Sequence, residues 1–283
     1  MAVTESQIQA GGLNWFYREA VPIGESDKPP VLLLHGIVAQ SYSWRGVMSD
    51  LAKQGFRAIA PDWIGHGFSD KPDKRTFAYT PTAFLQGLEQ LVEALALERF
   101  NLVVQGYLGG SVGLKYAQQH PDQIERLAIL NMPLSPAAKL PWKIQQLGLP
   151  LVGEMATQDP LLVDRTLEGG GPYQVDDADL DVYRRPFLTS SAAGRALFVT
   201  VRNLQLKAIM AELASGFKDW QKPTLVAWGL SDPWLSASEA ETFAQQFSHG
   251  EFVGLEQVGH YAQEDWSDKV SEALLPFFKQ MTL

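Results

Sequence analysis

The sequence predicts an α/β protein whose mostly parallel, doubly wound sheet carries a mainly helical insertion. Short apolar runs alternate with longer amphipathic segments, which is typical of right-handed βαβ units. The alternation stops near residue 132 and resumes near residue 218, and no strand-like run lies between. The length of 283 residues, with 46% hydrophobic and 19% charged side chains, suits a globular core with an inserted smaller domain.

The apolar runs predict buried strands, and the amphipathic segments predict the helices that cover them. The strands are expected at residues 31–34, 57–60, 102–104, 127–130, 224–228 and 251–255. The helices are expected at residues 44–53, 82–97, 109–119, 237–247 and 268–279. Ligands of such sheets bind beyond the carboxyl ends of the strands, so the residues just after each strand are the place to seek chemistry.

The interruption between two strands predicts a helical cap over the strand ends. We expect residues 132–217 to form this cap, and residues 1–131 and 218–283 to form the core. Within the cap, residues 197–213 show a helical pattern. The three glycines at 169–171 lack the lysine of a phosphate-binding loop, and we interpret them as a hinge.

Charge and composition exclude several classes of function. The formal net charge is −9, whereas phosphate binding needs a concentrated basic surface, so no nucleic-acid partner is expected. The chain has no cysteine, which excludes disulfides, thiolate metal sites and a cysteine nucleophile. His120 and His249 have no second ligand at metal spacing, so we expect neither a metal nor another cofactor.

The hydropathy pattern predicts a soluble, cytoplasmic protein. The first residues lack a basic segment followed by an apolar one, and no apolar run approaches the length of about 18 residues that a membrane span needs.

Two loops that follow predicted strands carry glycines suited to tight turns beside a site. After the first strand comes His35-Gly36-Ile37, where the N–H of Ile37 is a candidate oxyanion donor. After the second comes the segment 61–72, which contains His66. His66 is a conceivable base, but a structural role is favoured.

The strongest candidates for chemistry are Asp232 and His260, each placed just after a predicted strand. A carboxylate that accepts a hydrogen bond from an imidazole N–H selects one tautomer and stabilises the imidazolium. The acid precedes the histidine in the chain, which is the order found in hydrolases whose nucleophile lies on a strand-to-helix turn.

Taken together, His35-Gly36, residues 62–72, Trp228 through Asp232 and Gly259-His260 resemble the α/β-hydrolase fold. Residues 41–45, 62–65 and 181–187 resemble its haloalkane dehalogenase and epoxide hydrolase branch. The resemblance covers almost the whole chain. It implies a catalytic triad with a nucleophile between Gln105 and the following helix.

The expected nucleophile turn reads Gln-Gly-Tyr-Leu-Gly-Gly at residues 105–110 and contains no Ser, Cys or Asp. Compared with the family pattern, it carries one extra residue. Alignment from the strand puts Gly106 in the nucleophile's place, and alignment from the helix puts Tyr107 there; the helix length favours Tyr107. A phenol with a pKa of about 10 is almost fully protonated at neutral pH, so Tyr107 suits a proton donor or orienting hydroxyl better than a nucleophile.

Three neighbouring features complete the interpretation of this turn. A Gly-x-Ser-x-Gly pattern places Ser111 as an alternative nucleophile, but it lies one helical turn past Tyr107. The dehalogenase halide-binding Trp is Leu108 here and the family's Asn is Ile37, which disfavours dehalogenation. The backbone N–H groups of Ile37 and Leu108 need no particular side chain, so they are predicted to form the oxyanion hole.

Two functional hypotheses follow. In the first, His260 and Asp232 activate water against a small apolar ester, lactone or epoxide. In the second, the scaffold binds a small apolar ligand or a protein partner without catalysis. Candidate pocket residues are His35, Gly36, Trp63, Trp142, Tyr173 and Phe187; for the last three, packing within the insertion is at least as good an explanation.

Overall fold

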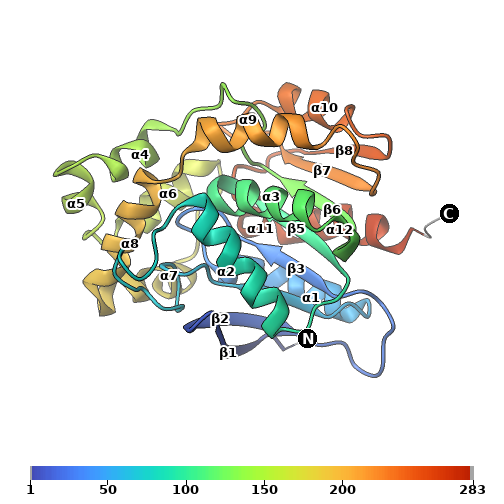
Figure 1. The fold of residues 1–283 in the computed structure, drawn as a ribbon, viewed down its shortest axis with the longest axis horizontal. Coiled ribbons are helices and arrows are strands. Elements are labelled where there is room, and N and C mark those ends of the chain that lie inside the picture. The colour runs from blue at the N-terminus through green and yellow to red at the C-terminus, as the bar shows by residue number, and fades with distance from the viewer. Residues whose placement is uncertain (1, 281–283) are drawn as a thin grey trace.

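The computed structural model describes residues 2–280, and within them eight strands form one sheet in the order β1-β2-β4-β3-β5-β6-β7-β8 (Figure 1). Strands β3 to β8 are mutually parallel, whereas β1 and β2 are antiparallel to their neighbours. The strands are Thr4–Ala10 (β1), Leu13–Ala20 (β2), Val31–Leu34 (β3), Ala58–Pro61 (β4), Phe100–Gln105 (β5), Ile124–Leu130 (β6), Thr224–Gly229 (β7) and Gly250–Leu255 (β8). The predicted fold class is confirmed, and each predicted strand lies in the parallel part of the sheet.

The sequence pattern missed β1 and β2. These strands form a hairpin at the edge of the sheet, and β1 is mostly exposed, with an alternating burial pattern and few apolar residues. The hairpin joins the sheet through the pairing of β2 with β4. Polar residues interrupt the apolar ones along both strands, so neither strand shows the apolar run that marks a buried strand.

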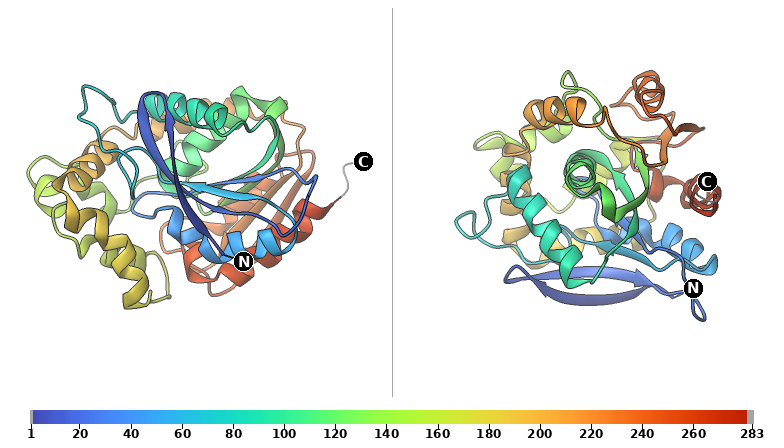
Figure 2. Two further views of the ribbon diagram at one scale, coloured as in Figure 1. Left: turned by 90° about the horizontal axis from the view of Figure 1, so that it is seen from below. Right: turned by 45° about the vertical axis from the view of Figure 1, so that its right-hand side comes forward.

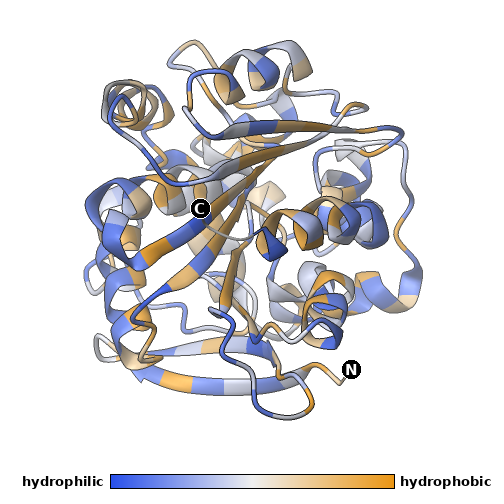
Figure 3. Cartoon of the chain, turned by 90° about the vertical axis from the view of Figure 1, so that its right-hand side faces the viewer, coloured by the Kyte–Doolittle hydropathy of each residue, from blue (hydrophilic) through white to orange (hydrophobic). Residues whose placement is uncertain are grey.

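Helices cover both faces of the sheet and divide the core in two. One hydrophobic cluster includes Leu88, Val112 and Phe243, and the other includes Met48 and Leu274. The hydrophobic colour gathers on the strands in the middle of the molecule (Figure 3). The helices that flank the sheet are Arg45–Lys53 (α1), Pro81–Ala94 (α2), Ser111–Gln119 (α3), Ala237–Ala244 (α10), Ala262–Asp265 (α11) and Ser267–Lys279 (α12).

Between β6 and β7 the chain forms six helices, here named the helical insert. All but the last of them in chain order lie beyond one end of the sheet (Figures 1 and 2). They are Trp142–Gln145 (α4), Val152–Ala156 (α5), Leu162–Leu167 (α6), Asp177–Thr189 (α7), Ser191–Arg202 (α8) and Leu206–Gly216 (α9). The predicted continuous helix at 197–213 is wrong, because Gln205 has a φ of +48° and separates α8 from α9.

Short turns complete the architecture. They are Ser41–Trp44 (η1), Gly106–Gly110 (η2), Pro121–Gln123 (η3), Gln146–Gly148 (η4) and Glu168–Gly170 (η5). The predicted helix after β5 begins at Ser111 instead of Gly109, because the wide turn η2 precedes it. Along residues 2–280 no helix is both long and apolar enough to cross a membrane.

Candidate active site

Asp232 and His260 meet at the carboxyl ends of β7 and β8. His260 Nδ1 lies 2.8 Å from Asp232 Oδ2. The same Asp232 oxygen accepts a hydrogen bond from Asn131 Nδ2 at 2.9 Å, and Oδ1 accepts from the N–H groups of Trp234 and Leu235 at 2.8 and 3.2 Å. The carboxylate therefore holds the proton of His260 on Nδ1 and leaves Nε2 as a potential base.

The surroundings of Asp232 favour its ionised form. Burial opposes ionisation, but attraction to His260 and the hydrogen bonds from His260, Trp234 and Asn131 outweigh it and lower the pKa of Asp232 below its usual value. Asn131 was not singled out from the sequence. Its position directly after β6, at the same edge as Asp232, is the signal that identifies it.

His260 is enclosed by aromatic rings and is only 1% exposed. The Tyr107 ring lies nearly parallel to the imidazole at a centroid distance of 5.5 Å, and Trp234 lies at 4.7 Å. Tyr261 packs edge-on at 4.9 Å. Among residues 2–280, no protein atom forms a hydrogen bond with His260 Nε2. The imidazole is thus fixed in place with one nitrogen unused.

The geometry places Gly106, and not Tyr107, at the nucleophile position. Gly106 follows β5 with a φ of +70°, and a Cβ on it would lie 3.5 Å from His260 Nε2. The prediction that Tyr107 takes this place is therefore wrong. The extra residue is absorbed after Gly106, in the wide turn η2, so the alignment from the strand is the correct one.

The backbone of Gly36 fills the space that a nucleophile's side chain would need. A Cβ on Gly106 would lie 2.9 Å from the Cα of Gly36, and a Cβ on Gly36 would lie 2.8 Å from the Cα of Gly106. Real Cβ atoms do not approach backbone this closely, so both positions require glycine in this conformation. The loop after β3 has closed onto the turn after β5.

Tyr107 points its hydroxyl away from His260 Nε2. The hydroxyl donates a hydrogen bond to the carbonyl oxygen of Lys139 in the helical insert at 3.1 Å. Burial raises the pKa of Tyr107. A neutral phenol committed to a backbone carbonyl is not placed to exchange a proton with His260, so the structure does not support Tyr107 as an acid or a base.

The predicted oxyanion hole is occupied by the protein itself. The N–H of Ile37 donates to the carbonyl oxygen of Tyr107 at 2.9 Å. The prediction of Ile37 as a free donor is therefore wrong for this conformation. Leu108, the second predicted donor, has φ +75° and ψ −69°. In this region the backbone of any residue other than glycine is strained by about 1–3 kcal/mol.

Gln105, which the sequence reasoning did not select, joins the loops of the site. Its Nε2 donates to the carbonyl of His260 at 2.9 Å, and its Oε1 accepts from the N–H of Gly36 at 3.1 Å. Both groups are buried. A glutamine can bridge a carbonyl and an amide in this way because it carries a donor and an acceptor.

Ser111 is not brought to His260. It is the first residue of α3, is fully buried, and donates its hydroxyl to the carbonyl of Leu108 at 3.2 Å. Its hydroxyl is therefore used in a hydrogen bond at the start of α3, and the structure does not support Ser111 as the nucleophile.

The predicted pocket residues have different locations. His35 is buried, and burial lowers its pKa; its Nε2 accepts from the N–H of Trp63 at 3.3 Å. Trp63 is itself fully buried in the core, and Trp142 is 66% exposed. Phe187 packs against the main core cluster.

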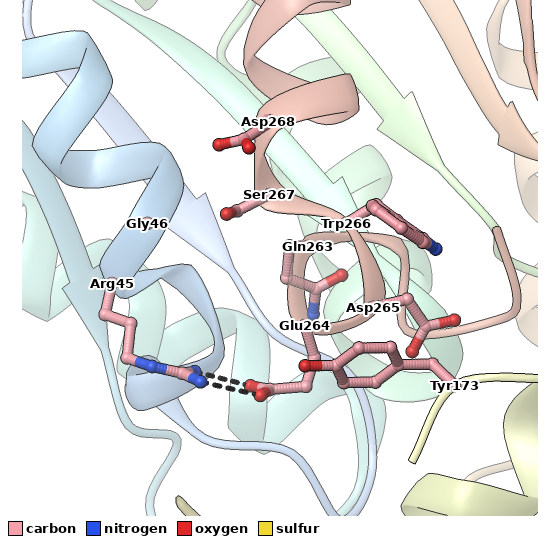
Figure 4. Close-up of a pocket in the computed structure, with 9 residues that line it drawn as sticks. All are labelled: Arg45, Gly46, Tyr173, Gln263, Glu264, Asp265, Trp266, Ser267 and Asp268. Atoms are coloured by element: carbon pink, nitrogen blue, oxygen red, sulfur yellow. Dashed lines mark hydrogen bonds and ion pairs between the residues drawn. The ribbon is translucent and has the colours of Figure 1, made fainter. Parts of the chain in front are cut away.

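Tyr173 lies at a cavity of about 250 Å³ next to the histidine loop, but His260 is not among the residues that line it. Figure 4 shows Arg45 beside Glu264 in this cavity. Arg45 donates to both oxygens of Glu264 at 2.7 and 2.9 Å, and to Asp179 of α7 at 2.6 Å. Tyr183 of α7 also donates to Glu264. This ion network ties the helical insert to the segment that carries His260.

The glycines at 169–171, which we interpreted as a hinge, are in close contact with the segment that carries His260. The N–H of His260 donates to the carbonyl of Gly170 at 2.6 Å. A Cβ on Gly171 would lie 2.7 Å from the Cα of Gly259. Small residues on both sides let the helical insert touch the backbone beside His260.

A second carboxyl group lies next to this contact. Asp265 accepts a hydrogen bond from the N–H of Gly259 at 2.8 Å. Burial, with repulsion from Glu264, raises the pKa of Asp265 to about 7. No group of three or more His, Asp or Glu side chains suited to hold a metal ion occurs in the part of the chain that the structure describes.

Comparison with known proteins is consistent with this geometry. The sequence pattern of the family described as alpha/beta hydrolase fold matches residues 29–169. A cis-3-alkyl-4-alkyloxetan-2-one decarboxylase of Shewanella oneidensis is 30% identical over 267 residues, which cover 88% of this chain and 81% of that protein. A haloalkane dehalogenase of Mycobacterium marinum is 30% identical over 265 residues, covering 89% and 85%.

Solved structures show the same likeness. The crystal structure of a haloalkane dehalogenase from Bradyrhizobium elkani superimposes with a TM-score of 0.85 at 25% identity, and the match covers 98% of each chain.

Proposed function

Because the chain belongs to the α/β-hydrolase superfamily, in its haloalkane dehalogenase-like branch, we propose that it hydrolyses a small apolar ester, lactone or epoxide without a covalent intermediate. The observation that carries the proposal is the unused Nε2 atom of His260, which faces Gly106 at the place where a nucleophile's side chain would begin. Water takes the role of the missing side chain when the Gly36 loop moves away from Gly106, because the two backbones are in contact in this structure. The helical insert acts as the cap over the site. Dehalogenation is not part of the proposal, because Gly106 offers no carboxylate to displace a halide.

The chemical step uses the Asp232–His260 pair as its base. A water molecule gives a proton to His260 Nε2 while its oxygen attacks the carbonyl carbon of an ester or lactone, or a ring carbon of an epoxide. The ionised Asp232 stabilises the imidazolium that forms. When the carbon–oxygen bond of the ester breaks, the imidazolium returns the proton to the leaving alkoxide, and the products are a carboxylic acid and an alcohol.

Among these substrates we favour a strained lactone. Two relatives, from Shewanella oneidensis and Xanthomonas campestris, are named for oxetan-2-ones, which are four-membered cyclic esters. Opening such a ring releases strain, which reduces the need for oxyanion stabilisation. This matters because the N–H of Ile37 is engaged by the carbonyl of Tyr107. Stabilisation by this amide requires the peptide between Tyr107 and Leu108 to rotate.

A second candidate function is ligand or partner binding without catalysis. Two observations favour it: the Tyr107 carbonyl takes the Ile37 N–H, and the Tyr107 ring is stacked on a nearly inaccessible His260.

Both functions are tested with a panel of a β-lactone, an aryl ester, an epoxide and a chloroalkane. We expect the lactone to be turned over fastest, and His260→Ala to reduce kcat/KM by about 10²–10⁴. His249→Ala, a histidine in an exposed turn, is the matched control and should match the parent protein.

Intact-mass spectrometry during turnover should find no covalent adduct. Turnover that survives His260→Ala, or an adduct on a side chain, would overturn the proposed mechanism. Absence of His260-dependent turnover on every substrate would support the non-catalytic role.

A further inference from the structure

A cavity of about 490 Å³ lies between the core loop that follows β4 and helices α5 and α8 of the helical insert. Neither His260, Asp232 nor Gly106 lines it. Its volume falls within the range of small-molecule sites, roughly 300–1,000 Å³. It is therefore a second place, separate from the candidate active site, where a ligand fits.

The floor of this cavity contains a lysine with one spare donor. The ammonium of Lys71 donates to the backbone carbonyls of Gly67 and Ser69 at 2.7 and 2.8 Å. A lysine has three N–H donors, so one is left for a ligand. Burial lowers the pKa of Lys71, and attraction to Asp62 and Asp70 offsets this only in part.

A second cation faces the same cavity from the helical insert. Arg195 of α8 donates one hydrogen bond to Ser191 Oγ at 2.6 Å, which leaves further guanidinium donors. Lys74 also lines the cavity, and the two carboxylates in the lining are Asp73 and Glu154. The lining is thus net positive in a chain whose formal net charge is −9.

The remaining wall is apolar. Tyr79 is only 1% exposed, and its hydroxyl donates to the carbonyl of Pro72 at 2.7 Å. Phe198 and Val199, both on α8, extend this wall. An occupant therefore meets cations at one part of the cavity and hydrocarbon at another.

We propose that this cavity binds a medium-chain alkyl carboxylate. The carboxylate lies between Arg195 and Lys71, and the alkyl chain lies against Tyr79, Phe198 and Val199. Arginine pairs with a carboxylate through two parallel hydrogen bonds, and the spare lysine donor adds a third. A neutral ligand forms no ion pair with these donors, and a cationic ligand meets like charge. The proposal does not depend on the chemistry assigned to His260.

Isothermal titration of decanoate into the full chain, below the concentration at which decanoate aggregates, tests the proposal. We expect a single site, and Arg195→Gln should weaken binding about tenfold or more through loss of a charge-assisted hydrogen bond. Ala192→Glu, which adds a negative charge to the lining near the start of α8, should weaken it similarly. Arg185→Gln, an exposed arginine of α7 outside the cavity, is the matched control and should not change binding.

Three further arms separate the alternatives. Acetate and 1-decanol should both bind far more weakly than decanoate, because acetate lacks the alkyl chain and 1-decanol lacks the carboxylate. His260→Ala should bind decanoate as the parent protein does. The proposal is overturned if Arg195→Gln binds like the parent, if 1-decanol binds as tightly as decanoate, or if His260→Ala abolishes binding, which would place decanoate at the candidate active site.

Discussion

Replacement of Gly106 by alanine measures how tightly the loop after β3 has closed onto the turn after β5. An alanine at this φ of +70° adopts a conformation that costs about 1–2 kcal/mol. Its Cβ would also lie 2.9 Å from the Cα of Gly36, an overlap with backbone that no side-chain rotation relieves. Overpacking of this kind costs about 1–3 kcal/mol more. The expected loss in the free energy of unfolding is therefore about 2–5 kcal/mol.

Gly12→Ala is the matched control, because it isolates the backbone cost. Gly12 has a φ of +78° in the turn between β1 and β2, and a Cβ there would have no neighbour within 4 Å. We expect a loss of only about 1–2 kcal/mol for this variant. The difference between the two variants, about 1–3 kcal/mol, is the steric contribution of Gly36.

The assay is equilibrium unfolding in urea, followed by far-ultraviolet circular dichroism, with free energies extrapolated to water. If Gly106→Ala loses no more stability than Gly12→Ala, the space beside His260 Nε2 is open and the loop does not fill it. That result would refute the view that Gly36 occupies the nucleophile's place, and it would strengthen the case for water bound there.

Two further predictions concern buried groups. Tyr107→Phe should lower stability by about 1 kcal/mol through loss of the hydrogen bond to the carbonyl of Lys139, yet leave any His260-dependent activity within about twofold; a loss of two orders of magnitude would contradict the assigned orientation of the hydroxyl. His66, whose Nε2 contacts Thr200, has its pKa lowered by burial to about 3, so between pH 6.5 and 3 the unfolded chain binds a proton that the folded protein does not. Stability should therefore rise with pH across this window, by up to about 1.4 kcal/mol per pH unit for this one group, and His66→Gln should flatten that slope in urea titrations at several pH values. An unchanged slope in the variant would show that His66 does not remain neutral in the folded protein.

The sequence alone determined the fold and the acid–histidine pair. Alternating apolar and amphipathic segments favour a parallel sheet covered by helices, because strands with continuous apolar runs need both faces buried. Since parallel strands end at one edge, Asp232 and His260 had to lie near each other, and their atoms are 2.8 Å apart. The hairpin of β1 and β2 escaped prediction because polar residues interrupt the apolar ones in both strands, although Trp15 and Phe16 of β2 are buried.

The residue at the nucleophile position could be identified only from the folded chain. The sequence from Gln105 to Gly110 can be aligned with the family pattern in two ways, which differ in the position of one extra residue. The residue types alone do not distinguish the two alignments. The positive φ of Gly106 and its approach to His260 Nε2 make the choice, since they depend on distances between chain segments far apart in sequence. The hydrogen-bond acceptor of the Ile37 N–H could not be predicted from the sequence either. Every residue carries the same backbone carbonyl, so residue types do not indicate that the carbonyl of Tyr107 is the acceptor.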